Sequence, residues 1–212
     1  VRLHVLLDGR DVYKQSALTY LDQLESHLSR LNNEYGVDFK IASGGGRMVT
    51  TMDRYNADWD MVKRGWDTHV LGEAPPFSSA ADAVQAYYTQ HPDGTDQMIP
   101  AFVIHDEHKQ PVGPITDGDS VVCFNFRGDR VIELSMAFES GSDFSYFDRQ
   151  RVPDVLYAGM MQYDGDLKIP QNYLVQPPII TNTVGEQLQS AGLQTLAISE
   201  TQKFGHVTYF WN

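Results

Sequence analysis

The stretch Ser120–Leu134 reads SVVCFNFRGDRVIEL, and its pattern changes sharply in the middle. Val121 to Phe126 is a run of mostly β-branched and aromatic residues after an Asp-Gly-Asp turn, which predicts a buried strand. Arg127 and Arg130 follow at once, with Gly128 between them to permit a tight turn. Ligands of open α/β sheets collect beyond the carboxyl ends of strands, so this loop is a candidate site for a phosphate or a carboxylate.

Two other interpretations of this loop stay open on these residues alone. Arg127 and Arg130 could be solvated side chains on an ordinary turn. The tripeptide Arg127-Gly128-Asp129 is also a cell-adhesion signal when it is displayed on a secreted loop. Here it follows a strand pattern in a chain without secretory features, which disfavours that reading.

Composition narrows the class of protein. The 212 residues are 42% hydrophobic and carry a net charge of −12, which argues against a nucleic-acid binder. No apolar run approaches the length that spans a bilayer, and no signal-peptide pattern is present. The single cysteine, Cys123, excludes an internal disulfide framework and is expected to be a small buried hydrophobe. We therefore expect a cytoplasmic protein that binds neither nucleic acid nor membrane, and a monomer.

The first part of the chain predicts a parallel strand–helix–strand unit. Arg2–Leu7 has a strand pattern, and a leucine stripe after Ser16 predicts a helix that Ser16 caps and that ends by Gly36. Asp38–Ser43 is the second predicted strand. It runs into three glycines, residues 44–46, which we expect to form a loop. The chain opens at Val1, directly in a strand pattern, so we expect a segment of a longer protein.

The middle of the chain continues as alternating helices and strands. Apolar spacing predicts a helix over 59–70 and another over Ser79–Tyr88, and the pattern predicts strands over Met98–Ile104 and Val155–Tyr163. The cluster from His105 to His108 contains metal-ligand residue types. Lysine, glutamine and proline follow it immediately, so an exposed turn is the favoured interpretation over a zinc site.

The last forty residues have a different character. Tyr173–Thr181 contains Pro177-Pro178 and predicts a stiff extended linker, which makes this segment a candidate domain boundary. A capping-box spacing then predicts a helix that ends before Gly192. Leu193–Ile198 and Gly205–Trp211 are predicted strands of a further, incomplete α/β unit.

Cationic side chains recur on the loops that follow the predicted strands. Several arginines with one carboxylate suit a small polyanion whose hydroxyl loses and regains a proton. Asp11 can serve as the general base and acid, although an acidic residue near a helix N-terminus can instead interact only with the helix dipole. The residues in question are Arg10, Asp11, Arg47, Arg54, Arg127, Arg130 and Lys203.

The ordered set of motifs resembles the cofactor-independent phosphoglycerate mutases over essentially the whole chain. The matching motifs are Asp-Gly-Arg-Asp at 8–11, Gly-Arg at 46–47 with Met-Asp-Arg at 52–54, Phe-Asn-Phe-Arg-Gly-Asp-Arg at 124–130, Tyr-Ala-Gly-Met at 157–160, Gln-Tyr-Asp-Gly at 162–165, Ser-Glu-Thr-Gln-Lys at 199–203 and Gly-His-Val-Thr at 205–208. The region from Trp59 to Trp66 is similar to the plant and kinetoplastid branch. The spacing from Arg47 to Arg54 is one residue longer than in the bacterial pattern.

The resemblance implies an α/β fold in two parts. Residues 1–175 would be most of an inserted phosphotransferase domain that holds the substrate, and residues 176–212 the hinge and start of the second half of an alkaline phosphatase-like domain. The implied reaction interconverts 3-phosphoglycerate and 2-phosphoglycerate through a phosphoserine, without 2,3-bisphosphoglycerate. It implies that Arg10, Asp11, Arg47, Arg54, Arg127, Arg130 and Lys203 contact the substrate, with Asp11 relaying the proton.

The same resemblance implies what this chain lacks. No residue of this chain matches the family's serine nucleophile or the ligands of its two divalent metals, manganese or cobalt. No residue matches its catalytic histidine either, which lies upstream of the Asp-Gly-Arg-Asp motif. We therefore expect the 212-residue segment alone to be inactive. Two rival functions stay open: a non-catalytic anion-binding module, and another phosphotransferase or hydrolase of the alkaline phosphatase superfamily.

Overall fold

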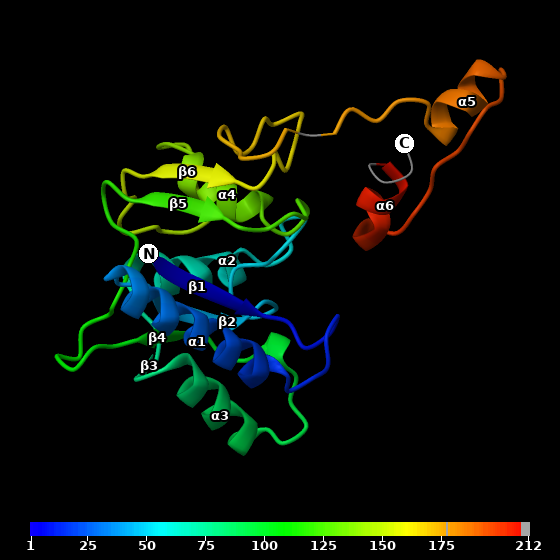
Figure 1. Ribbon diagram of the computed structural model, residues 1–212. Coiled ribbons are helices and arrows are strands. Elements are labelled where there is room, and N and C mark those ends of the chain that lie inside the picture. The colour runs from blue at the N-terminus through cyan, green and yellow to red at the C-terminus, as the bar shows by residue number, and fades with distance from the viewer. Residues whose placement is uncertain (177, 209–212) are drawn as a thin grey trace. The chain divides into compact units, whose positions relative to one another are not determined.

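A computed structural model describes residues 1–176 and 178–208 (Figure 1). The chain separates into two compact units, residues 1–174 and residues 175–212. The first unit contains all of the strands found in the described residues, and the second contains short helices. Within the described residues, no helix combines the length and the apolar character needed to cross a membrane.

The first unit begins with the predicted parallel strand–helix–strand arrangement. Strand β1 (Arg2–Leu7) has the predicted bounds, helix α1 (Ala17–Tyr35) follows, and strand β2 (Lys40–Gly46) pairs with β1 in parallel. Gly36 ends α1 in the left-handed conformation at φ 63°, which costs glycine little because it has no Cβ.

Ser16 is the N-cap residue of α1, but its side chain does not make the predicted capping hydrogen bond. The Ser16 hydroxyl donates instead to the carbonyl of Tyr13. The first amide groups of the helix, those of Ser16 and Ala17, donate to the carboxylate of Asp96 at 2.9 and 3.2 Å. A distant acidic residue therefore takes the place of the local cap, and it also suits the positive end of the helix dipole.

The glycines at 44–46 form the end of strand β2, where a loop was predicted. They pair with the last residues of β1 and are buried. A Cβ on Gly44 would lie 2.6 Å from both Val5 and Phe102, and a Cβ on Gly46 would lie 2.3 Å from the Gln97 backbone. The glycines are therefore required for close packing, since these contacts leave no room for a side chain.

The main sheet has the order β1-β2-β4-β3. Strand β4 (Phe102–Ile104) is antiparallel to β2 and shorter than predicted, because a 3₁₀ turn over Asp96–Met98 takes up the start of the predicted strand. Strand β3 (Pro76–Phe77) pairs with β4 in parallel. The connection after β4 is mostly exposed and turns back at the His105–Pro111 bridge, as predicted for that segment.

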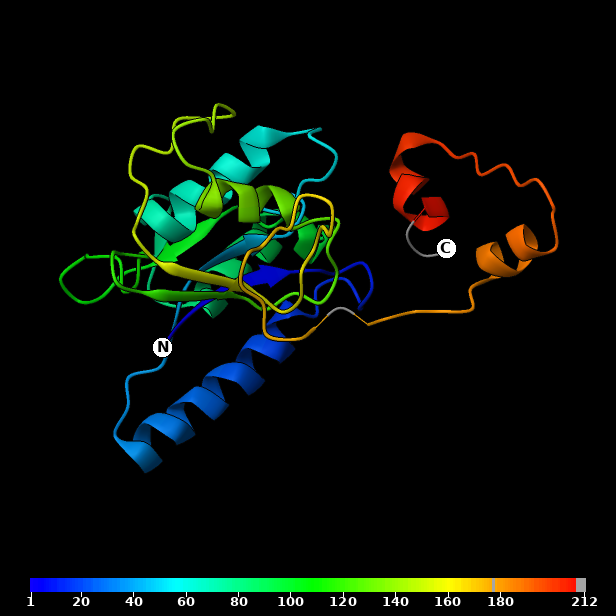
Figure 2. The ribbon, with the colours of Figure 1, turned by 90° about the horizontal axis from the view of Figure 1, so that it is seen from above.

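Helices cover both faces of this sheet (Figure 2). Helix α3 (Ala80–Gln90), capped by the Ser79 hydroxyl as predicted, packs with α1 on one face. Helix α2 (Trp59–Trp66), continued by a π-helical turn over Asp67–Leu71, lies on the other face. Helix α4 (Ile132–Glu139) packs instead against strand β6 (Leu156–Gly159) of a second sheet (Figure 1). Helix α4 was missed because its apolar residues show little helical periodicity. Two apolar clusters result: one includes Leu21, Leu28, Ile41, Val84, Ile99 and Phe102, and the other Trp66, Val70, Ile115 and Ala137.

The stretch at 120–134 folds differently from its prediction. Strand β5 (Ser120–Cys123) is shorter, and it pairs in parallel with β6 (Leu156–Gly159) in a separate two-stranded sheet. The strand is not fully buried, and Phe124 and Phe126 beyond its end are 83% and 79% exposed. A two-stranded sheet cannot enclose a strand on both faces and both edges, so the apolar run overstates the burial.

The second unit confirms one predicted element and corrects two. Helix α5 (Val184–Ser190) begins with the predicted capping box between Thr183 and Glu186. Residues 193–198 form no strand. A 3₁₀ turn (Thr201–Lys203) precedes helix α6 (Phe204–Thr208), and this helix includes residues 205–208, where the start of a strand was predicted. Pro177 of the predicted linker and residues 209–211 of the last predicted strand lie outside the described residues.

Candidate functional site

The predicted cationic loops of the first unit lie beyond strands that run in one direction. Strands β1, β2 and β5 end toward the same side of this unit (Figure 1). Asp8 follows β1, Arg47 follows β2, and the loop with Arg127 and Arg130 comes after β5. Although β5 belongs to the second sheet, its carboxyl end points to the same side as those of β1 and β2, so loops that are distant in sequence can meet there.

Arg47 joins the first two loops. Its Nε lies 2.7 Å from Asp8 Oδ1, and its Nη2 lies 4.0 Å from Asp11 Oδ2. The amide of Asp11 in turn donates to the Asp8 carboxylate at 2.9 Å. Arg47 is largely buried, whereas the Asp11 side chain is 77% exposed. The arginine is therefore held in place, and one carboxylate beside it stays open to solvent.

Asp129 joins the other two loops. Its carboxylate accepts two hydrogen bonds from Arg127, at 2.7 and 3.0 Å, and one from Arg54 at 3.1 Å. Burial alone would raise the pKa of Asp129, but hydrogen bonds and charge attraction, first from Arg127 and then from Arg54, hold it below its usual value. The carboxylate therefore stays ionised and fixes the orientation of two guanidinium groups.

Arg130 is held without a carboxylate. Its Nη1 donates to the carbonyl of Met52 at 2.6 Å, and within the described residues it makes no ion pair closer than 4 Å. Its pKa is lowered by burial and then by the charges of Arg54 and Arg47, with Arg127 contributing less. Arg130 is thus close enough to the other three guanidinium groups to be repelled by them, and an anion bound beside it would relieve that repulsion.

The structure brings together five of the seven predicted residues. Arg47, Arg54, Arg127 and Arg130 form the cluster, and Asp11 lies at its edge through Arg47. Arg10 is exposed on the loop after β1. Lys203 belongs to the second unit and is exposed at the end of its 3₁₀ turn.

Sequence reasoning missed the groups that orient the arginines. Asp8 and Asp129 each lie within a matching motif, but only the neighbouring arginines of those motifs were predicted as site residues. An acidic residue within a few positions of an arginine on a turn is a usable signal for such pairing. The Met52 carbonyl could not have been found, since a backbone group carries no sequence signal.

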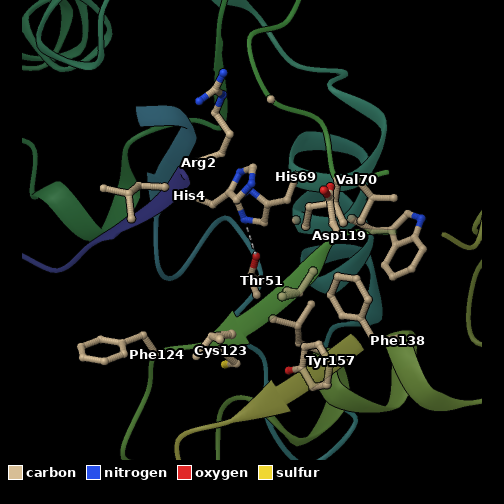
Figure 3. Close-up of a pocket in the computed structure, with 18 of the residues that line it drawn as sticks. Arg2, His4, Thr51, His69, Val70, Asp119, Cys123, Phe124, Phe138 and Tyr157 are labelled. Atoms are coloured by element: carbon tan, nitrogen blue, oxygen red, sulfur yellow. Dashed lines mark hydrogen bonds between the residues drawn. The ribbon is translucent and has the colours of Figure 1, made fainter. Parts of the chain in front are cut away.

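A cavity of about 770 Å³ lies between β1 and β5 (Figure 3), and none of these four arginines lines it. Its lining is mixed: apolar residues include Trp66, Val121 and Phe138, and polar ones include His4 and His69. Burial lowers the pKa of His4 to about 4 and that of His69 well below its usual value, so both imidazoles are neutral. The lining also holds the carboxylate of Asp119 and one arginine, Arg2, whose guanidinium group is paired with Asp38. This wall therefore lacks the several converging cations that suit a polyanion.

No metal centre is formed by the described residues, which contain no group of three or more histidine, cysteine or acidic side chains arranged to hold an ion. The arginine cluster is also unsuited to a cation, because its own charge is positive. Two of the acidic side chains there, Asp8 and Asp129, are already engaged by guanidinium groups. The residues present therefore do not fit a metal.

Comparisons with a family model, with curated proteins and with solved structures all match this chain to the same group of enzymes. Residues 1–165 match the family model described as the BPG-independent PGAM N-terminus. The chain is 58% identical over 212 residues to a probable 2,3-bisphosphoglycerate-independent phosphoglycerate mutase of Leptospira interrogans. It is 55% identical over 213 residues to the corresponding mutase of Prunus dulcis, and 54% identical over 212 residues to that of Trypanosoma brucei brucei.

The match covers all of this chain but a smaller part of each relative. The chain spans 38% of the Leptospira and Trypanosoma proteins and 43% of the Prunus protein. Among solved structures, phosphoglycerate mutase of Leishmania mexicana at low cobalt concentration superposes with a TM-score of 0.92 and 55% sequence identity. That match covers the whole of this chain and 38% of the Leishmania chain.

Proposed function

The chain belongs to the family of 2,3-bisphosphoglycerate-independent phosphoglycerate mutases, and we propose that it is the substrate-holding part of an enzyme that interconverts 3-phosphoglycerate and 2-phosphoglycerate. The observation that carries the proposal is the cluster of Arg47, Arg54, Arg127 and Arg130. Both phosphoglycerates carry a phosphate and a carboxylate, and in 3-phosphoglycerate the two groups lie at opposite ends. Four guanidinium groups oriented in advance can bind both ends and fix the molecule between them.

The acidic partners explain how the arginines stay ordered without substrate. Asp8 and Asp129 hold the guanidinium groups of Arg47, Arg54 and Arg127. Binding therefore orders few additional side chains, which preserves affinity. Asp11 supports a second role, since its exposed carboxylate beside Arg47 can accept and return the proton of a glycerate hydroxyl. We include Arg10 and Lys203 among the substrate contacts on the motif resemblance alone.

The transfer chemistry itself belongs to parts of the protein outside these 212 residues. In this proposal they supply a serine nucleophile and two divalent metal ions, manganese or cobalt, and no 2,3-bisphosphoglycerate is consumed. Residues 1–175 form the substrate-holding domain, and residues 176–212 the hinge and the beginning of the metal-bearing domain. We further propose that the intact enzyme is a cytoplasmic monomer.

The test is an assay of the full-length protein with 3-phosphoglycerate, without added 2,3-bisphosphoglycerate. We expect turnover in the wild type. Arg127→Ala and Arg130→Ala should each lose about 2–5 kcal/mol of transition-state stabilisation, because each removes one charged anchor of the substrate. Arg30→Ala is the matched control, since Arg30 pairs with Glu34 on the exposed side of α1. Unchanged kcat/KM in both cluster variants would show that the loop is only structural.

A substrate panel separates the proposal from its rivals. Turnover of other phosphorylated compounds with none of 3-phosphoglycerate would favour a different phosphotransferase or hydrolase. Phosphoglycerate binding with no turnover by the metal-loaded full-length protein would favour an anion-binding module.

A further inference from the structure

The turn from Thr51 to Asn56 has an unusual backbone. Thr51, Tyr55 and Asn56 have φ values of 78°, 63° and 56°, all in the left-handed region. For a β-branched residue such as threonine this conformation is an outlier, because its Cβ substituents crowd the backbone. Such a conformation persists only where the surrounding structure holds it in place.

A buried chain of hydrogen bonds holds the start of this turn. The Thr51 hydroxyl contacts Nε2 of His69 at 3.2 Å, and Nδ1 of His69 contacts the Ser43 hydroxyl at 2.8 Å. The same hydroxyl lies 2.7 Å from Nδ1 of His4. Figure 3 shows the Thr51 hydroxyl directed at the imidazole on the wall of the cavity. Because Ser43, Thr51 and His69 are all buried, losing one partner would leave the others unsatisfied.

Buried carboxylates hold the end of the turn. The amide of Asn56 donates to Glu133 Oε1 at 2.9 Å, and the amide of Asp58 donates to Asp53 Oδ2 at 2.6 Å. Glu133 is 4% exposed and Asp53 is 5% exposed. Glu133 belongs to α4, so this contact ties the turn to a helix about 77 residues further along the chain.

Between these two anchors lie the groups that orient two arginines of the cluster. The Met52 carbonyl accepts from Arg130 Nη1, and Arg54 Nη1 donates to Asp129. Met52 and Arg54 are separated by a single residue, so a small rotation of the turn would displace both guanidinium groups together. Both guanidinium groups would then meet the anionic groups of the substrate in a poorer geometry, which weakens binding.

We propose that His69, acting through Thr51, and Glu133, acting through Asn56, are positioning residues that hold this strained turn and thereby place Arg54 and Arg130 for the substrate. The inference rests on the proposed function, since it names how that same site is kept in shape. Neither His69 nor Glu133 touches the substrate in this arrangement. Both act through the backbone that carries the arginines.

The kinetic test uses full-length protein and the variant Thr51→Val, which keeps the side-chain shape and removes the hydroxyl. We expect KM for 3-phosphoglycerate to rise about tenfold while kcat changes less than about twofold, because the lost orientation weakens binding of ground state and transition state alike. His69→Leu should raise KM to the same extent. His69→Gln retains an amide that can bond to Thr51, so its KM should lie close to that of the wild type. Glu133→Gln should stay near wild type, since its amide oxygen can still accept from Asn56, whereas Glu133→Leu should not.

Thr68→Val is the matched control. Thr68 is buried next to His69 and donates its hydroxyl hydrogen bond to the Arg64 carbonyl, away from the turn. We expect a lower melting temperature with unchanged KM. If Thr51→Val and Thr68→Val lower the melting temperature alike and neither raises KM, the residues are only structural and the proposal is overturned.

A second measurement does not depend on turnover. The ¹⁵N resonances of the Arg54 and Arg130 side chains in substrate-free protein should shift or broaden in Thr51→Val and stay unchanged in Thr68→Val. A wild type without mutase activity would refute the proposed function, and these resonances would still decide the positioning role. Unchanged resonances in Thr51→Val would refute the positioning role whatever the activity.

Discussion

Arg54 donates a hydrogen bond to the carboxylate of Asp129 over 3.1 Å, although 75 residues separate them in the chain. Asp129 also binds Arg127, so one carboxylate joins two loops of the site. Such a bridge gives the cluster order before any ligand arrives. It also makes the stability of the protein depend on the charge of one side chain.

Asp129→Asn should lower the free energy of unfolding of the full-length protein by about 1–3 kcal/mol at pH 7, because charged hydrogen bonds are replaced by weaker ones. The folded-state pKa of Asp129 is lowered, so its stabilisation is present above the unfolded pKa and is lost as pH falls through the folded one. Urea unfolding of both proteins between pH 7 and pH 3 should show the difference shrinking with acid. Asp38→Asn, at an exposed ion pair, should have a smaller effect.

Glu133→Gln should show a pH dependence of the free energy of unfolding opposite to that of Asp129→Asn. Burial is the main cause that raises the pKa of Glu133 from 4.5 to about 7. Its favourable contribution is therefore fully present below pH 4.5 and is lost as pH rises toward 7, by roughly 3 kcal/mol. The difference between wild type and variant, measured by urea unfolding from pH 4.5 to pH 8, should follow that curve. A difference that is flat with pH would contradict it.

Gly46→Ala should destabilise the protein by at least about 1–3 kcal/mol, because the new Cβ would lie 2.3 Å from the Gln97 backbone, which cannot move aside cheaply. Thermal unfolding of the full-length protein measures this effect. Gly165→Ala is the control, since a Cβ there meets nothing within 4 Å. Equal melting temperatures for the two variants would show that residues 44–46 act only as a flexible connection.

Asp11→Asn should lower kcat by about 10²-fold or more with a smaller change in KM, because the amide cannot accept the glycerate proton. Steady-state kinetics of the full-length protein in both directions test this. Asp93→Asn, at a fully exposed acid near Lys14, should leave both constants unchanged. A rise in KM alone would assign Asp11 to substrate holding rather than to proton transfer.

Sequence patterns correctly predicted the helices and strands whose formation depends on residues close together in the chain. The bounds of β1, the helices α1 and α3, and the capping box of α5 all follow from apolar spacing and cap chemistry within a few residues. The predictions failed where contacts with residues distant in the sequence determine the local structure. Asp96 replaces Ser16 as the cap of α1, and the glycines at 44–46 belong to a strand because Val5, Phe102 and Gln97 lie against them.

Residue order alone was enough to predict arginines on the loops that follow strands, because residue types can be read directly along the chain. Which of these arginines meet depends on how the chain folds. Arg47, Arg54, Arg127 and Arg130 form one cluster because strands of two sheets end toward the same side and because Asp8, Asp129 and the Met52 carbonyl fix the guanidinium groups. The strained turn at Thr51–Asn56 is likewise a product of packing, because only buried partners from other elements can hold threonine in a conformation that its own sterics disfavour.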